Sequence, residues 1–151
     1  MVTSAAGDRG DGGGAAAAGV PTAIAVGYDG SPDAVAALRW AAALAARTGA
    51  ELRVVHAVGL LEHAGLAGGP ARDAALAVAA AAGVEETQFV WQRVDGEPAS
   101  VLVREAERGA DLLVVGSRGF WAHPGVLGST SLELAERGPV PVVIVPRPGR
   151  P

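Results

Sequence analysis

Two short segments in the C-terminal half carry the residue types of a phosphate-binding site. The first is Gly116-Ser117-Arg118-Gly119, and the second, after eight intervening residues, is Gly128-Ser129-Thr130. Glycines let a backbone come close to an anion, and the N–H groups and hydroxyls of a Gly-Ser-Thr segment that opens a helix donate hydrogen bonds to it. The two segments therefore predict a cradle for the phosphates of a nucleotide.

Each of these residues also has an interpretation without a ligand. The glycines fit a tight connection between a strand and a helix, and Arg118 is either paired with a phosphate or solvated. Ser129 and Thr130 either donate to phosphate or magnesium, or cap the helix that they open. Asp29 follows the apolar run 23–26 and either accepts a hydrogen bond from ribose or adenine, or caps the next turn.

The composition excludes several other kinds of chemistry. The chain of 151 residues has no cysteine, and all 12 of its basic residues are arginine. Thiol nucleophiles, thiolate zinc sites, Walker-type loops and Schiff-base lysines are therefore excluded. The three histidines stand apart in sequence and no Gly-x-Ser-x-Gly elbow is present, so we predict no metal site and no catalytic residue. A net charge of −4 argues against nucleic-acid binding.

Alternating strands and helices must position the candidate residues. Apolar runs predict strands over 23–26, 52–58, 87–94, 112–115 and 140–145, and helical patterns predict helices over 32–47, 71–82, 98–108 and 129–137. This alternation predicts an α/β three-layer sandwich with a five-stranded parallel sheet. In the order 3-2-1-4-5, Asp29 and the glycine segments lie at the carboxyl ends of neighbouring strands, where such sheets bind ligands.

The chain is predicted to contain one domain. Residues 1–20 are rich in glycine and alanine and are expected to form a disordered tail, which leaves 21–147 as the domain. The N-terminal segment lacks the charge order of a signal peptide, and no run of about 18 apolar residues suggests a membrane span. We expect a cytoplasmic protein.

From about residue 22 to 146, the order of motifs resembles the universal stress protein family. Ala25 to Ser31 resembles the first strand and acidic turn of that family, and Val54 to Val58 resembles its second strand. The Gly-x-x-Gly-x8-Gly-Ser-Thr spacing is one residue shorter than the family pattern, and Pro139 to Pro146 resembles the final strand. The segment between the two glycine motifs contains the bulky Phe120 and Trp121, where the family usually has small or basic residues.

The resemblance implies a fold of the adenine nucleotide alpha hydrolase-like type and a regulatory role in the stress response. It implies that ATP or a related adenine nucleotide binds, with or without Mg²⁺, and that hydrolysis is slow at most. The residues implied are Asp29, Ala57, Gly116, Ser117, Arg118, Gly119, Gly128, Ser129 and Thr130. It also implies a homodimer formed through strand 140–145.

Two other functions stay open at this point. The first is a dimeric interaction module of the same fold that binds no nucleotide, with Phe120 and Trp121 filling the phosphate site. The second is an ATP-using transferase or pyrophosphatase of a related fold, although the motifs His-Ile-Gly-His and Ser-Gly-Gly-x-Asp-Ser of such enzymes are absent from the sequence.

Overall fold

The computed structural model describes residues 19–65, 68–119, 123 and 125–149. Residues 1–18 of the predicted tail, and Phe120 and Trp121, lie outside the described residues. The elements are β1 (Ala23–Gly27), α2 (Pro32–Thr48), β2 (Glu51–Val58), α3 (Leu60–His63), α4 (Arg72–Ala81), η1 (Glu86–Gln88), β3 (Phe89–Asp95), α5 (Pro98–Glu107), β4 (Leu112–Gly116), α6 (Ser129–Arg137) and β5 (Val142–Val145).

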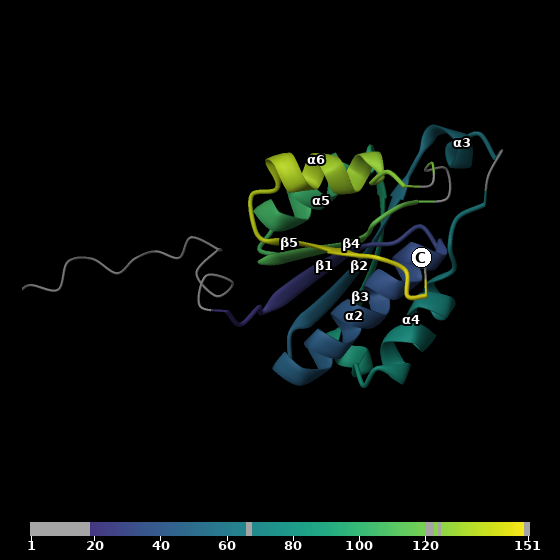
Figure 1. The fold of residues 1–151 in the computed structure, drawn as a ribbon. Coiled ribbons are helices and arrows are strands. Elements are labelled where there is room, and N and C mark those ends of the chain that lie inside the picture. The colour runs from purple at the N-terminus through teal and green to yellow at the C-terminus, as the bar shows by residue number, and fades with distance from the viewer. Residues whose placement is uncertain (1–18, 66–67, 120–122, 124, 150–151) are drawn as a thin grey trace, which may run out of the picture.

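The five strands form one parallel sheet in the order β3-β2-β1-β4-β5. Helices α2 and α4 cover one face of the sheet, and α5 and α6 cover the other (Figure 1). The predicted three-layer sandwich and strand order are therefore confirmed. Since the strand order reverses between β1 and β4, the carboxyl ends of these two strands flank the crevice typical of doubly wound sheets.

The strands at the centre of the sheet contribute side chains to two hydrophobic cores, one on each face of the sheet. Ile24 and Val26 of β1 pack with α2 and α4, whereas Ala25 between them packs with α5. This follows from the two-residue period of a strand, which sends successive side chains to opposite faces. Strands β1 and β4 are consequently apolar throughout, as is typical of parallel strands with both faces covered.

Three differences of more than one residue separate the observed elements from the sequence-based predictions. Strand β5 begins at Val142 instead of 140, because Pro139 and Pro141 have no N–H to donate to a sheet. Strand β3 begins at Phe89, because residues 86–88 form a 3₁₀ turn held by a capping box from Glu85. The segment 59–69, predicted as a loop, contains the one-turn helix α3.

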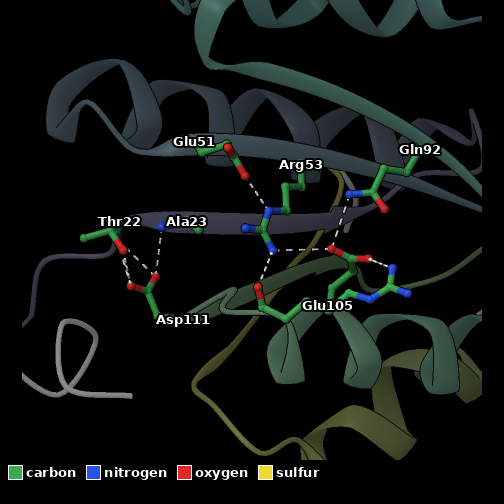
Figure 2. A network of polar contacts seen from close by, with 8 residues as sticks. Thr22, Ala23, Glu51, Arg53, Gln92, Glu105 and Asp111 are labelled. Carbon is green, nitrogen blue, oxygen red and sulfur yellow. Dashed lines mark hydrogen bonds and ion pairs between the residues drawn. The ribbon is translucent and has the colours of Figure 1, made fainter. Parts of the chain in front are cut away.

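Buried polar groups fix the strands that border the crevice. The carboxylate of Asp111, which is 1% exposed, accepts hydrogen bonds from the backbone N–H of Thr22 at 2.9 Å and from its hydroxyl at 2.9 Å (Figure 2). Thr22 directly precedes β1 and Asp111 directly precedes β4. This contact therefore ties the amino ends of the two strands together and sets the register of their carboxyl ends.

Within the described segments, no helix is both long and apolar enough to cross a membrane.

Candidate functional site

A cavity of about 480 Å³ lies at the carboxyl ends of β1, β2 and β4. It extends between the start of α5 and the start of α6. Its lining consists of Gly27, Tyr28, Asp29, Ala34, Val55, His56, Ala57, Pro98, Val101, Leu102, Val115, Gly116, Arg118, Gly119, His123, Val126, Leu127, Gly128, Ser129, Thr130 and Ser131. The cavity thus stands where the topology of a doubly wound sheet places a ligand.

Asp29 lines the cavity in the turn between β1 and α2. Its Oδ1 accepts a hydrogen bond from the backbone N–H of Ser31 at 2.9 Å, and Ser31 in turn caps α2 through the N–H of Ala34. The other oxygen of Asp29, Oδ2, faces Gly119, where a Cβ would lie 3.0 Å from it. One carboxylate oxygen therefore stabilises the turn, while the other is directed toward the glycine loop.

The loop after β4 packs directly on the first turn of α2. A Cβ on Gly116 would lie 2.6 Å from the backbone carbon and 2.8 Å from the carbonyl oxygen of Asp33. The hydroxyl of Ser117 donates to Asp33 Oδ2 at 2.7 Å. Ser117 is consequently turned toward α2 and is not among the residues that line the cavity, whereas Gly116 lines it by its backbone.

The second glycine segment opens α6 at the cavity wall. Gly128 is the N-cap residue and has no side chain to satisfy the N–H groups of the first turn. Its own N–H donates to the carbonyl of Ser117 at 2.8 Å, which holds the two glycine segments together. Ser129 and Thr130 follow at the cavity wall. The uncapped N–H groups and the positive end of the helix dipole therefore favour an anion here.

Arg118 supplies a cationic side chain at the same place. Its Nε and Nη1 atoms are buried, and within the residues that the structure describes neither has a hydrogen-bond partner. A buried guanidinium without an acceptor is costly, because each of its N–H groups has lost its water. Together with the start of α6, Arg118 forms a site whose chemistry fits a phosphate.

The part of the cavity beside β1 and β2 is less polar. Tyr28 is 6% exposed and contacts Trp91 edge to face, with 6.2 Å between the ring centroids. Burial, and then the negative charge of Asp29, raise the pKa of the Tyr28 hydroxyl, which therefore stays protonated and able to donate. Ala57 is half-buried and exposes β2 backbone to the cavity. A flat, partly polar ring such as a nucleobase fits these neighbours.

The structure thus brings together eight of the predicted residues and leaves Ser117 outside the lining. The sequence reasoning missed Ser131, whose buried hydroxyl donates to the carbonyl of Gly116 at 2.6 Å. The position of Ser131 on the first turn of a helix after Gly128 was a usable signal. It also missed Tyr28 and His123, for which no local pattern indicated a place in the cavity. His56, which lies in the predicted strand 52–58, lines the cavity as well.

Comparisons with known proteins agree with this architecture. The profile described as the universal stress protein family matches residues 22–146. A solved structure of a universal stress protein in complex with cAMP is 33% identical, covers 83% of this chain and 97% of that one, and superposes with a TM-score of 0.66. A universal stress protein family member from Burkholderia pseudomallei is 28% identical over 83% of this chain and 96% of that one, with a TM-score of 0.61.

A structure from Archaeoglobus fulgidus in complex with dAMP is 22% identical, covers 83% of this chain and 97% of that one, and has a TM-score of 0.58, which supports the fold alone. A sequence comparison with curated proteins gave no match. The fold is of the adenine nucleotide alpha hydrolase-like type, and the resemblance noted in the sequence is confirmed. From the family match over most of its length, this chain belongs to the universal stress protein family.

Proposed function

We propose that the cavity binds an adenine nucleotide and that the protein is a regulatory module whose state depends on this ligand. The observation that carries the proposal is the guanidinium of Arg118. Its Nε and Nη1 atoms are buried without a hydrogen-bond partner among the described residues, and it lies in the wall that also contains the start of α6. A phosphate supplies the acceptors that this cation lacks. The base then occupies the end formed by Tyr28 and Ala57, and Asp29 faces the ribose.

The cAMP bound to the relative of 33% identity supports an adenine nucleotide as the ligand class. ATP, with or without Mg²⁺, and cAMP are both candidates. They differ in their phosphate groups, so the residues around the phosphates determine which of them binds. Arg118 is the only arginine among the described residues that line the cavity. Ser129 and Thr130 are the lining residues with a hydroxyl that lie nearest to the start of α6. These groups position a phosphate but include no general base, so we expect binding with slow hydrolysis at most.

The first test is mass spectrometry of the small molecules released when freshly purified protein is denatured, followed by calorimetric titration with ATP, ADP, AMP and cAMP. The titrations are run with and without Mg²⁺. We expect one adenine nucleotide per chain. A protein that purifies empty and ignores all four nucleotides would contradict the proposal and favour the interaction module that binds no nucleotide.

The matched variants are Arg118→Gln and Arg137→Gln. Removing a charge-assisted hydrogen bond to phosphate lowers affinity about 10- to 100-fold, so we expect a loss of this size for Arg118→Gln. Arg137 lies at the end of α6, exposed and paired with Glu133 at 3.5 Å, so its replacement leaves the affinity unchanged. If the two variants bind the nucleotide with equal affinity, Arg118 does not contact the phosphate. Replacing Gly116 is a poor test, because any side chain there meets the backbone of Asp33.

We also propose that the module is a homodimer formed through β5. This strand is at the edge of the sheet, and all four of its residues are half-buried. An apolar edge strand exposes unpaired backbone groups that a second copy can pair with.

A further inference from the structure

Both ring nitrogens of His56 contact hydrogen-bond acceptors. Nδ1 lies 3.1 Å from the backbone oxygen of Tyr28, and Nε2 lies 2.6 Å from Oε2 of Glu62. A carbonyl oxygen and an ionised carboxylate only accept, so each contact requires a proton on the nitrogen. The hydrogen bond from His56, assisted by the charges of His56 and Arg93, lowers the pKa of Glu62, which is therefore ionised. With Glu62 ionised, both contacts are hydrogen bonds only when both ring nitrogens of His56 carry protons.

Helix α3, which carries Glu62, is held to the domain by polar contacts. None of the residues of α3 is buried, and Leu60 is 83% exposed. Of the residues of α3, Glu62 points toward the domain, and its side chain is 13% exposed. Besides its contact with His56, it forms an ion pair with Arg93, whose Nη2 lies 2.5 Å from Oε1 of Glu62. His63 and Asp95 form a further pair at 2.9 Å, but both side chains are exposed, so this pair contributes little to the stability of α3. The placement of α3 therefore depends mainly on the charges around Glu62.

The same histidine belongs to the cavity. His56 lines it, and so does Tyr28, whose carbonyl His56 holds. In Figure 1, α3 lies beyond the carboxyl ends of the strands, on the side where β1 and β2 enter the cavity wall. A change in the contact between His56 and Glu62 is thus a change at the base-binding end of the site.

We propose that His56 and Glu62 form a proton-dependent latch that holds α3 against the end of β2 and fixes His56 in the wall of the cavity at its base-binding end. The consequence for nucleotide release rests on the proposed function. Loss of a ring proton removes one of the two hydrogen bonds and the charge that strengthens the other, so α3 is released as the pH rises. The latch also opens in strong acid, when Glu62 becomes protonated.

Several other charged or titratable groups face this pair. They are Tyr28 and Asp29 from the turn after β1, His63 from α3, and Arg93 and Asp95 from β3. Arg93 remains positively charged throughout and keeps its contact with Glu62. The opening of the latch as the pH rises is therefore assigned to His56, and His63 is the group that must be tested as the alternative.

The experiment uses the full chain without nucleotide. Long-range proton–nitrogen NMR reports whether one or both nitrogens of His56 carry protons between about pH 5.5 and pH 8.5. Hydrogen exchange, expressed as protection factors to remove the intrinsic effect of pH, reports on the amides of His63, Ala64 and Gly65, which donate within and just after α3. We expect both nitrogens to be protonated at the acid end, and the protection to fall about tenfold as one proton is lost.

Two variants break the latch in different ways. Glu62→Gln removes the charge, whereas Gly69→Ala keeps all charged groups but places a Cβ against the Glu62 carboxylate and 2.9 Å from His56 Nε2. Both are expected to lower the protection of α3 to its high-pH value at every pH. The matched control, His63→Gln, keeps the wild-type profile. A singly protonated His56 throughout, or α3 protection that follows His63 instead, would overturn the latch.

The link to the ligand is measured separately, as the dissociation rates of ATP and cAMP at about pH 6.5. We expect Gly69→Ala to release bound nucleotide about tenfold faster than wild type. An unchanged rate, with α3 released in the exchange experiment, would overturn the link between the latch and the cavity. If neither nucleotide binds at any pH, the proposed function fails, and the exchange data still decide whether the latch exists.

Discussion

Gly116 is required at its position because the backbone of Asp33 occupies the space that a side chain would need. The close approach brings the end of β4 against the first turn of α2, and the hydrogen bond from Ser117 to Asp33 at 2.7 Å fastens it there. The glycine that the sequence indicated as a phosphate contact thus has a packing role as well. The two interpretations are compatible, since its backbone also lines the cavity.

At this residue we predict that Gly116→Ala destabilises the fold by about 1–3 kcal/mol, because the Cβ meets backbone atoms that cannot move independently. Urea denaturation measures the change. The control is Gly68→Ala, since no heavy atom of the described residues lies within 4 Å of a Cβ there. A stability equal to that of the control would mean that the loop shifts freely and that the close approach is unimportant.

Helix α5 is joined to the sheet by a buried ion-pair network. Glu105 is 2% exposed, accepts a hydrogen bond from Gln92 at 3.3 Å and lies 3.5 Å from Nη1 of Arg53 (Figure 2). Arg53 itself, on β2, also donates to Glu51 at 2.5 Å. The network thus connects α5 to β2 and β3.

We predict that Glu105→Ala lowers the free energy of unfolding by about 3 kcal/mol, because the partly buried Arg53 loses an anionic neighbour. Glu107→Ala, on the exposed side of the same helix, is the control and is expected to change it by less than about 0.5 kcal/mol. Denaturant midpoints at unchanged slope give both values. A small effect of Glu105→Ala would show that Glu51 alone is sufficient for Arg53.

For helix α3, the lowered pKa of Glu62 gives a pH dependence of stability with a definite sign. A carboxyl whose pKa is lower in the folded state stabilises the fold above its unfolded pKa, and this contribution is lost as the pH falls through its folded pKa. We therefore expect the wild type to lose more stability than Glu62→Gln between about pH 6 and pH 3. Denaturation curves of both proteins at both pH values test this prediction. An equal loss of stability in the wild type and in Glu62→Gln would contradict it.

At the scale of the whole molecule, β5 leaves one edge of the sheet unpaired in the single chain. The carbonyls of Pro141 and Val145 accept from Leu113 and Ser117 of the β4 side, so by alternation the N–H of Ile144 points away from β4. A dimer formed through this edge would use that N–H. A proline at 144 therefore removes a hydrogen bond between subunits without removing one within the sheet.

We predict that Ile144→Pro converts a dimer to a monomer in light-scattering measurements after size exclusion. Ile144→Ala is the matched control, because it loses the same side-chain packing but keeps the N–H, and it is expected to remain dimeric. If the wild type is a monomer, or if Ile144→Pro leaves the dimer intact, β5 is not the interface.

The sequence alone was sufficient to predict the fold, because its apolar strands alternate with helices and this alternation requires parallel strands joined by right-handed crossovers. It also placed Asp29 and both glycine segments at one edge of the sheet, because the carboxyl ends of parallel strands lie together. The one segment whose pattern was too weak was 59–69, where α3 forms without burying any residue of its own.

Only the tertiary structure decided what the individual side chains do. Ser117 turns to Asp33, 84 residues earlier in the chain, instead of into the cavity, and two guanidinium nitrogens of Arg118 are buried instead of solvated. His56, interpreted as a strand residue, contacts Tyr28 and Glu62 at once. Local patterns report backbone conformation and the face of an element. The partner and the burial of a polar side chain depend on residues distant in sequence, which only packing brings within hydrogen-bond distance.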